Sequence, residues 1–278
     1  MVGMLLIFVG SFFVEIFDSI GKNKVNNHEE SRSTMAFLSV FWGAIFLFLI
    51  AIFKEGSFVF QVASLPILLV RVVLDIIQTY VTVTAISRAD RTTFGFIRII
   101  TIPLLLLVDV YLGYEITPLA MGGVFIIIMG LMALSLNKGI GKDGVGWVTF
   151  SAVNGVITIS LFKYNITHFN SVVADQLLVY MMTLIFFTLF SVFREKENPF
   201  AFLKKPQFLL QSVSVGIGGI IESFAYNYGA ASVITAAKRV GSIFWSVVSG
   251  GLYFHEQKIM VKILIFFILA TGIVFLTV

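Results

Sequence analysis

The sequence predicts an all-α integral membrane protein with about ten transmembrane helices in two inverted five-helix repeats. Three observations carry this prediction: the composition, the spacing of the apolar runs, and an internal symmetry that reverses the loop charge. Of the 278 residues, 58% are hydrophobic and 12% are charged, and the mean hydropathy is +1.00. Soluble domains carry roughly 25% charged residues. This chain therefore lacks the polar surface that would cover a water-soluble globule.

The apolar runs have the length of membrane spans, because about 20 helical residues cross the hydrocarbon core. The runs lack the period-two alternation of barrel strands, so they favour helices. The connections are too short for a separate extramembrane domain. The run at 4–20 has no basic residue before it and contains Glu15 and Asp18, which favours a retained helix over a cleavable signal peptide. The predicted helices are 4–20, 33–53, 63–86, 93–112, 118–136, 146–164, 171–193, 208–229, 233–254 and 259–278.

Matching residues recur at an offset of 141 and divide the chain into repeats at 1–137 and 138–278. The matches are Tyr114-Glu115 with His255-Glu256, Arg98 with Arg239 and, with one residue of slippage, Phe53-Lys54-Glu55 with Phe193-Arg194-Glu195 and Pro66 with Pro206. Each repeat holds five predicted helices. Because five is odd, the second repeat must enter the membrane from the opposite side, so the repeats are expected to be inverted.

Loop charges agree with this inversion. Counting Lys and Arg in the loops gives 13 on one face and 2 on the other. In the first repeat the loops after helices 1 and 3 hold most of them, whereas in the second repeat the loops after helices 7 and 9 do. The minority face holds Lys54 and Lys163. The positive-inside rule places the basic face in the cytoplasm and both termini outside. The predicted location is the plasma (cell inner) membrane.

Residues near the end of each repeat resemble the drug/metabolite transporter superfamily. Ala236-Ala237-Lys238-Arg239-Val240, leading through Ser246 and Ser249 to Leu252-Tyr253-Phe254-His255-Glu256, is similar to the helix-nine signature of EamA-type permeases and of the sugar-phosphate and nucleotide-sugar branch. Pro103 and Leu112-Gly113-Tyr114-Glu115 resemble the helix-four signature. The resemblance implies two five-helix halves and secondary transport. Two features depart from it. Phe244 occupies the position in the second repeat that is equivalent to Pro103, and the family is drawn with both termini in the cytoplasm, whereas the loop charges here place them outside.

Ionisable residues inside the predicted spans are the candidate functional residues. A charge near the bilayer centre costs about 2.5–3.5 kcal/mol on insertion scales, so it normally faces a cavity or a partner. Arg71 and Asp75 lie four residues apart on one helical face, and Gln78 follows on the same face. Either a structural ion pair between helices or a role in substrate binding fits this spacing. Tyr226 and Asn227 are further candidates for the lining of a cavity, or ordinary packing residues.

Lys238 and Arg239 are adjacent cations in the predicted helix 233–254. Two neighbouring cations in a dry site repel each other unless an anion lies between them, which favours a phosphate, a carboxylate or a nearby acid such as Glu222. The resemblance implies that this Lys-Arg pair holds substrate phosphate, with Arg98 contributing from the symmetric helix. The alternative is that both side chains reach out to the membrane interface.

Glu15 is the candidate for proton coupling. Its neighbours Phe12, Phe13, Val14 and Ile16 are apolar, and apolar surroundings favour the neutral form of a carboxyl group. The segment from Val14 to Lys22 also resembles helix 1 of the small multidrug-resistance branch, which implies a proton-coupling Glu. The alternative is a static ion pair with a basic residue across the bundle.

These features predict a secondary active transporter of a small polar or anionic metabolite that works by alternating access. The alternatives are a proton-coupled exporter of lipophilic cations and, in a different class, a membrane-embedded enzyme or a non-transporting receptor. The chain has no cysteine, which excludes disulfides and thiolate chemistry, and its three histidines lie in different loops. We expect no catalytic site, cofactor, metal or nucleic acid. The expected partners are the substrate, the lipid bilayer, and protons or a counter-substrate, with the chain a monomer or a homodimer.

Overall fold

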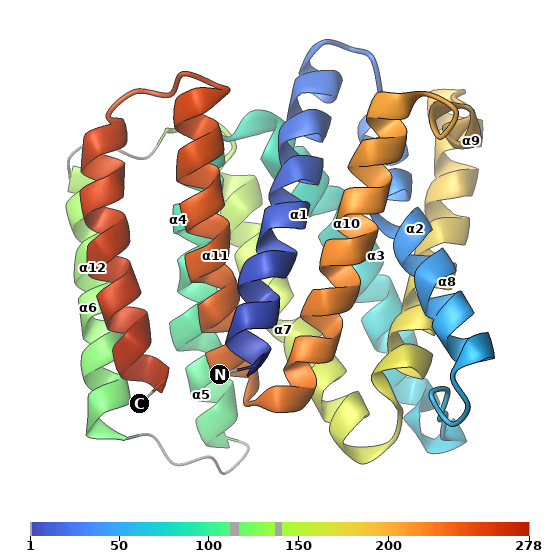
Figure 1. Cartoon of the computed structure of the whole chain (residues 1–278), viewed down its shortest axis with the longest axis horizontal. Coiled ribbons are helices and arrows are strands. Elements are labelled where there is room, and N and C mark those ends of the chain that lie inside the picture. Colours follow the sequence, from blue (N-terminus) through green and yellow to red (C-terminus); the bar gives the residue numbers. More distant parts are fainter. Residues whose placement is uncertain (1, 112–116, 137–140, 278) are drawn as a thin grey trace.

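A computed structural model describes residues 2–111, 117–136 and 141–277. The described residues fold into helices and contain no strand (Figure 1). Both ends of the chain lie at the same edge of the bundle, at the bottom of Figure 1. Seven helical segments of the described chain are long and apolar enough to cross a membrane. The prediction of a helical multi-pass membrane protein is confirmed at this level.

The seven candidate spans are α1 (Val2–Asn26), α2 (Arg32–Phe53), α3 (Leu65–Arg88) with the turn before it, α4 (Arg91–Ile97) continued by α5 (Thr101–Tyr111), α7 (Val145–His168), α8 (Val172–Phe190) with the π-turn after it, and α10 (Pro206–Ala225) with the turn after it. The remaining helices are α6 (Pro118–Leu136), α9 (Pro199–Phe202), α11 (Ala231–Leu252) and α12 (Ile259–Thr277). The expected Leu112-Gly113-Tyr114-Glu115 signature lies outside the described residues.

The predicted helix 93–112 is interrupted. A 3-10 turn at Arg98–Ile100 separates α4 from α5. The cause is Pro103, which donates no backbone hydrogen bond and whose ring crowds the carbonyl group four residues earlier, that of Ile99. The interruption places Arg98 on the turn rather than in the middle of a regular helix.

Helices from the two sequence halves are interleaved. Helix α1 packs between α10 and α11, α2 packs on α8 and α10, α3 packs on α7, and α6 packs on α12 (Figure 1). The crossing of α1 and α10 depends on small residues, since a Cβ atom on Gly218 would lie 2.8 Å from the carbonyl oxygen of Gly10. Small residues allow helix backbones to approach closely in membranes. The halves are thus held together by contacts that cross between them.

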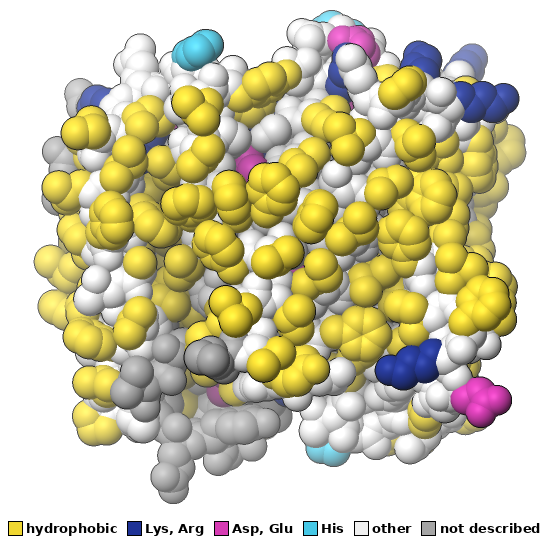
Figure 2. All heavy atoms as spheres, viewed as in Figure 1, with side chains coloured by type: hydrophobic (Ala, Val, Ile, Leu, Met, Phe, Trp, Pro, Cys, Tyr) yellow, Lys and Arg dark blue, Asp and Glu magenta, His cyan; other side chains and the backbone are white. Residues whose placement is uncertain are grey.

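The surface has an apolar band and one basic end. Figure 2 shows apolar side chains over most of the displayed face, with Lys and Arg gathered mainly near its upper edge. Large apolar residues are exposed, for example Phe53 at 82% and Leu252 at 78%. We call the edge with loops 27–31, 191–205 and 253–258 the basic end. Its described basic residues are Lys22, Lys24, Arg32, Arg88, Arg91, Lys142, Arg194, Lys196, Lys204, Lys205, Lys258 and Lys262.

Candidate functional site

Most of the predicted site residues line one cavity of about 180 Å³. The cavity lies between α3, α7, α8, α10, α11 and the turn at Arg98. Its lining includes eight residues that the sequence analysis selected: Arg71, Asp75, Gln78, Arg98, Glu222, Tyr226, Lys238 and Arg239. Residues that are up to 168 positions apart in the chain are therefore brought together in one site.

One side of the cavity, which we call the cation wall, consists of Arg98, Lys238, Arg239 and Glu222. The Lys238 ammonium group pairs with Glu222 Oε2 at 2.5 Å. Arg239 is 1% exposed, and its Nε donates to Thr101 Oγ1 at 3.0 Å. Arg98 lies 5.0 Å from the centre of the Phe94 ring. Within the described chain, Arg239 Nη2 and Arg98 Nε are buried without a hydrogen-bond partner, and neither guanidinium lies within 4.0 Å of a carboxylate.

Another part of the lining is formed by Arg71 and Asp75 of α3, and we call these two residues, with the buried Asp175 that pairs with Arg71, the acid wall. Arg71 Nε donates to Asp75 Oδ2 at 3.0 Å, and a second nitrogen forms an ion pair with Asp175. Its Nη2 donates to Gln176 Oε1 at 2.5 Å. The contacts with Asp175 and Gln176 join α3 to α8, as expected of a structural ion pair between helices, one of the two interpretations of Arg71 and Asp75. Asp75 remains 22% exposed.

Two further predicted residues are fixed by their neighbours. Gln78 donates to Ser151 Oγ at 3.0 Å, and its Oε1 accepts from Asn154 Nδ2 at 2.8 Å. The Tyr226 hydroxyl lies 2.9 Å from Thr235 Oγ1. Asn227 is not brought to this cavity: it is exposed and lines a separate recess. It follows Tyr226 on a 3-10 turn, so its side chain leaves the helix in another direction.

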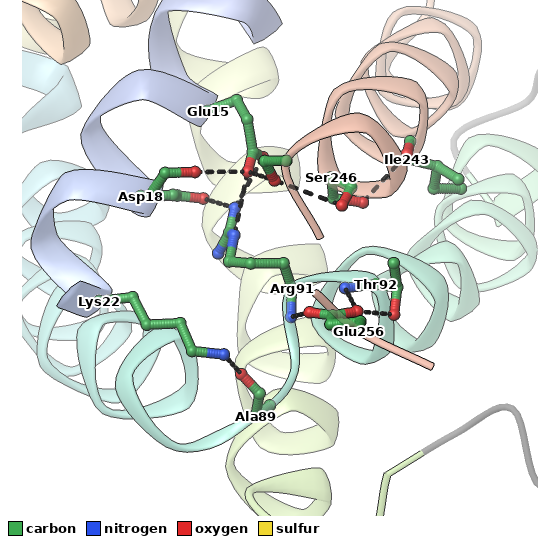
Figure 3. A network of polar contacts seen from close by, with 11 residues as sticks. Glu15, Asp18, Lys22, Ala89, Arg91, Thr92, Ile243, Ser246 and Glu256 are labelled. Carbon is green, nitrogen blue, oxygen red and sulfur yellow. Dashed lines mark hydrogen bonds and ion pairs between the residues drawn. The ribbon is translucent and has the colours of Figure 1, made fainter. Parts of the chain in front are cut away.

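Glu15 lies outside the central cavity, in a cluster around Arg91 (Figure 3). Arg91 Nε and Nη2 donate to the two oxygens of Glu15 at 3.0 and 2.7 Å, and Nη2 also lies 2.7 Å from Asp18. Ser249 donates to Glu15 Oε1 at 2.5 Å. We call Glu15, Asp18, Arg91 and Glu256 the Arg91 network. The contacts of Glu15 are those of a static ion pair, the alternative to its predicted proton-coupling role.

Glu256 joins this network from the loop after α11. It accepts hydrogen bonds from the Arg91 backbone amide at 2.6 Å and from Thr92 Oγ1 at 2.5 Å, so it caps the start of α4. Lys262 Nζ lies 3.1 Å from its carboxylate. Burial raises the pKa of Glu256, but the Thr92 hydrogen bond and the charge of Lys262 outweigh burial and lower that pKa overall. The network therefore ties α1, α4 and the loop after α11 together at the basic end.

A smaller cavity of about 50 Å³ lies between the Arg91 network and the cation wall. Glu15, Asp18 and Arg91 line it, and so do Arg98, Lys238 and Arg239. The three cations thus line both cavities. They form a layer between the central cavity and the network at the basic end.

A buried acid at the basic end gives a pH-dependent prediction. Glu30, in the loop between α1 and α2, is 3% exposed, and its Oε1 accepts from Gln211 Nε2 at 3.0 Å. Burial raises the pKa of Glu30 from 4.5 to about 8. The folded state therefore holds this proton more tightly than the unfolded state, and stability falls as pH rises through this range.

Glu30→Gln is expected to raise the melting temperature in detergent at pH 8.5 and to change it little at pH 5. The gain should grow from about pH 5 to about pH 8 and reach on the order of 4 kcal/mol. The matched control is Glu29→Gln, since Glu29 is exposed and pairs with Lys24 at 2.6 Å. An equal gain at both pH values, or the same gain from the control, would contradict the assignment.

Several residues of the site are not predicted by the sequence. Arg91 falls in the loop between the predicted helices 63–86 and 93–112, and no sequence signal distinguishes it from the other basic loop residues. Asp175 had a usable signal, because it is an acid inside the predicted helix 171–193. Asp109, late in the predicted helix 93–112, is 4% exposed and accepts from the Ser232 backbone amide at 3.1 Å. It caps the start of α11 from a helix of the other half.

Comparison with known proteins identifies no family for this chain. No protein-family model matches this chain, and no curated protein sequence is significantly similar to it.

Proposed function

We propose that this protein is a secondary active transporter that carries a small anionic metabolite by alternating access. The observation that supports this most is the pair of guanidinium groups, the half-buried Arg98 and the buried Arg239, that line one cavity without a carboxylate partner. A buried charge without a partner is costly. A bound carboxylate or phosphate would supply the missing partner, and Arg is well suited to hold either with two parallel hydrogen bonds.

An inverted ten-helix arrangement is part of the proposal, with α6, α11 and α12 crossing the membrane beside the seven candidate spans. Two observations support the inversion. Arg98 and Arg239 are 141 residues apart and line the same cavity. Arg91 and Ser232 are also 141 residues apart, and each donates a backbone amide to an acid of the other half, Glu256 and Asp109. A two-fold axis between the halves, as in the drug/metabolite transporter superfamily that the sequence resembles, accounts for the matched guanidinium and amide positions, whereas the two acids do not share the offset of 141.

A second candidate function has one observation in its favour. An apolar recess of about 340 Å³ lies between α1 and α11, is lined by Phe12, Trp245 and Leu252, and reaches Glu15. A lipophilic cation would suit such a recess if Glu15 were free. Glu15 already pairs with Arg91 at 2.7 Å, which favours the anion transporter over the cation exporter.

A flux measurement tests the proposal. Purified protein in liposomes is expected to give saturable uptake of a radiolabelled anion from a panel of organic phosphates, dicarboxylates and acidic amino acids. Unlabelled substrate should compete, and preloaded vesicles should exchange. Uptake no faster than in protein-free liposomes across the whole panel would refute anion transport. Uptake of lipophilic cations alone, driven by a proton gradient, would favour the exporter.

A further inference from the structure

The charges around the central cavity are unevenly distributed. On the cation wall, Arg98, Lys238 and Arg239 have one carboxylate in ion-pair contact, that of Glu222 with Lys238, which leaves two positive charges without a direct partner. On the acid wall, Arg71 faces both Asp75 and Asp175, which leaves one negative charge in excess. The cavity is therefore bipolar as well as positive overall.

These two walls stand on different helices. Helix α3, which carries Arg71 and Asp75, packs on α7 and α8, while α11 packs mainly on α1, α4 and α12. The cation wall also faces Asp18, but that carboxylate lies 2.7 Å from Arg91 and is not within 4.0 Å of Arg98. Among the described residues, Arg239 therefore has no carboxylate within 4.0 Å, although Glu15 and Asp18, which share Arg91, line the smaller cavity beside it.

Asp75 is the part of the acid wall that a ligand can reach. Its Oδ2 accepts from Arg71, whereas its Oδ1 takes no hydrogen bond within the described chain. The side chain is 22% exposed and lines the cavity, while Asp175 is fully buried behind it. One carboxylate oxygen is thus left to accept hydrogen bonds from an ammonium group.

We propose that the substrate carries an ammonium group and, separated from it along the molecule, at least one anionic group, with a net negative charge. Acidic amino acids and phosphorylated amino alcohols belong to this class. The anionic groups bind at Arg98 and Arg239, and the ammonium group donates to Asp75. This inference rests on the proposed anion transport and specifies its substrate.

Matched ligand pairs test it, because the two members differ only in the ammonium group. The pairs are glutamate with glutarate and phosphoethanolamine with ethyl phosphate, and binding to the purified full-length protein is measured by calorimetry. We expect the amino-bearing member of at least one pair to bind about tenfold or more tightly than its partner, since a charge-assisted hydrogen bond contributes about 1.5–3 kcal/mol. This comparison needs no variant.

Asp75→Asn then assigns the effect to one residue. The variant keeps an oxygen for Arg71, and Arg71 keeps its pair with Asp175. We expect the preference for the amino-bearing ligand to fall to about onefold, while glutarate and ethyl phosphate bind as well as before or better. Glu55→Gln, in an exposed loop, is the control and should preserve the preference.

The outcomes separate the two proposals. Equal binding of both members of each pair to the wild-type protein, or a preference that survives Asp75→Asn, would overturn the bipolar substrate while leaving anion transport in place. If no ligand in either pair binds and no anion is transported in liposomes, both proposals fail.

Discussion

Arg239→Gln is expected to weaken the binding of anionic ligands by about 10- to 100-fold without reducing the stability of the ligand-free protein. The loss follows from one charge-assisted contact, which contributes about 1.5–3 kcal/mol. The unchanged or higher stability follows because Arg239 is 1% exposed and lacks an acidic partner, so its replacement removes an unfavourable buried charge. Calorimetry and thermal unfolding in detergent measure the two effects.

A residue with a purely structural role would behave differently. Its replacement would lower the melting temperature and affect all ligands alike. Arg98→Gln should reproduce the behaviour of Arg239→Gln, because Arg98 also has no carboxylate partner in the described chain. Arg194→Gln is the matched control, since Arg194 is exposed at the basic end. Unchanged anion affinity in both cavity variants would remove the main support for the proposed function.

The second large effect is expected from Arg91→Gln, which should destabilise the folded protein by about 3–5 kcal/mol. Arg91 is 1% exposed and holds Glu15 and Asp18 at 2.7 Å each. Without Arg91, the buried carboxylates of Glu15 and Asp18 repel each other, because no other cation of the described chain forms an ion pair with them. Breaking a buried ion pair from one side typically costs this amount. Thermal or denaturant unfolding in detergent measures it.

A charge-neutral replacement of the whole cluster separates charge from shape. Because buried ion clusters are replaceable by neutral groups at little cost, the triple variant Arg91→Gln, Glu15→Gln and Asp18→Asn should recover most of the lost stability. Arg88→Gln, which replaces an exposed residue at the same end, should have little effect. A triple variant as unstable as Arg91→Gln would show that the shape of the arginine, rather than its charge, holds α1 to α4.

The composition and the apolar runs predicted the helical membrane fold at a coarse level, and eight of the ten candidate site residues, chosen as polar residues inside the predicted spans, line one cavity. This worked because charges at membrane depth must face a cavity or a partner, so they gather in the interior. Lys238, Arg239 and Arg98 could be selected on that ground alone. Their identity as functional residues stays a prediction.

The partners of these charges could not be predicted, because they depend on how distant helices pack. Arg71 pairs with Asp175, 104 residues later, and Arg91 with Glu15, 76 residues earlier. Nothing in the local sequence distinguishes the basic residue that turns inward, Arg91, from the one that turns outward, Arg88. The sequence likewise contained Pro103 but could not reveal that Arg98 would lie on the resulting turn.

The position of α1 between α10 and α11 has a consequence for synthesis. Helix α1 is made before the helices that cover it, which follow about 200 residues later; at 5–20 residues per second this is a wait of roughly 10–40 s. During that interval Glu15 lacks Ser249, and until α4 emerges both Glu15 and Asp18 lack Arg91. The nascent chain must therefore accommodate the two acids of α1 without their final partners until α4 and α11 have been made.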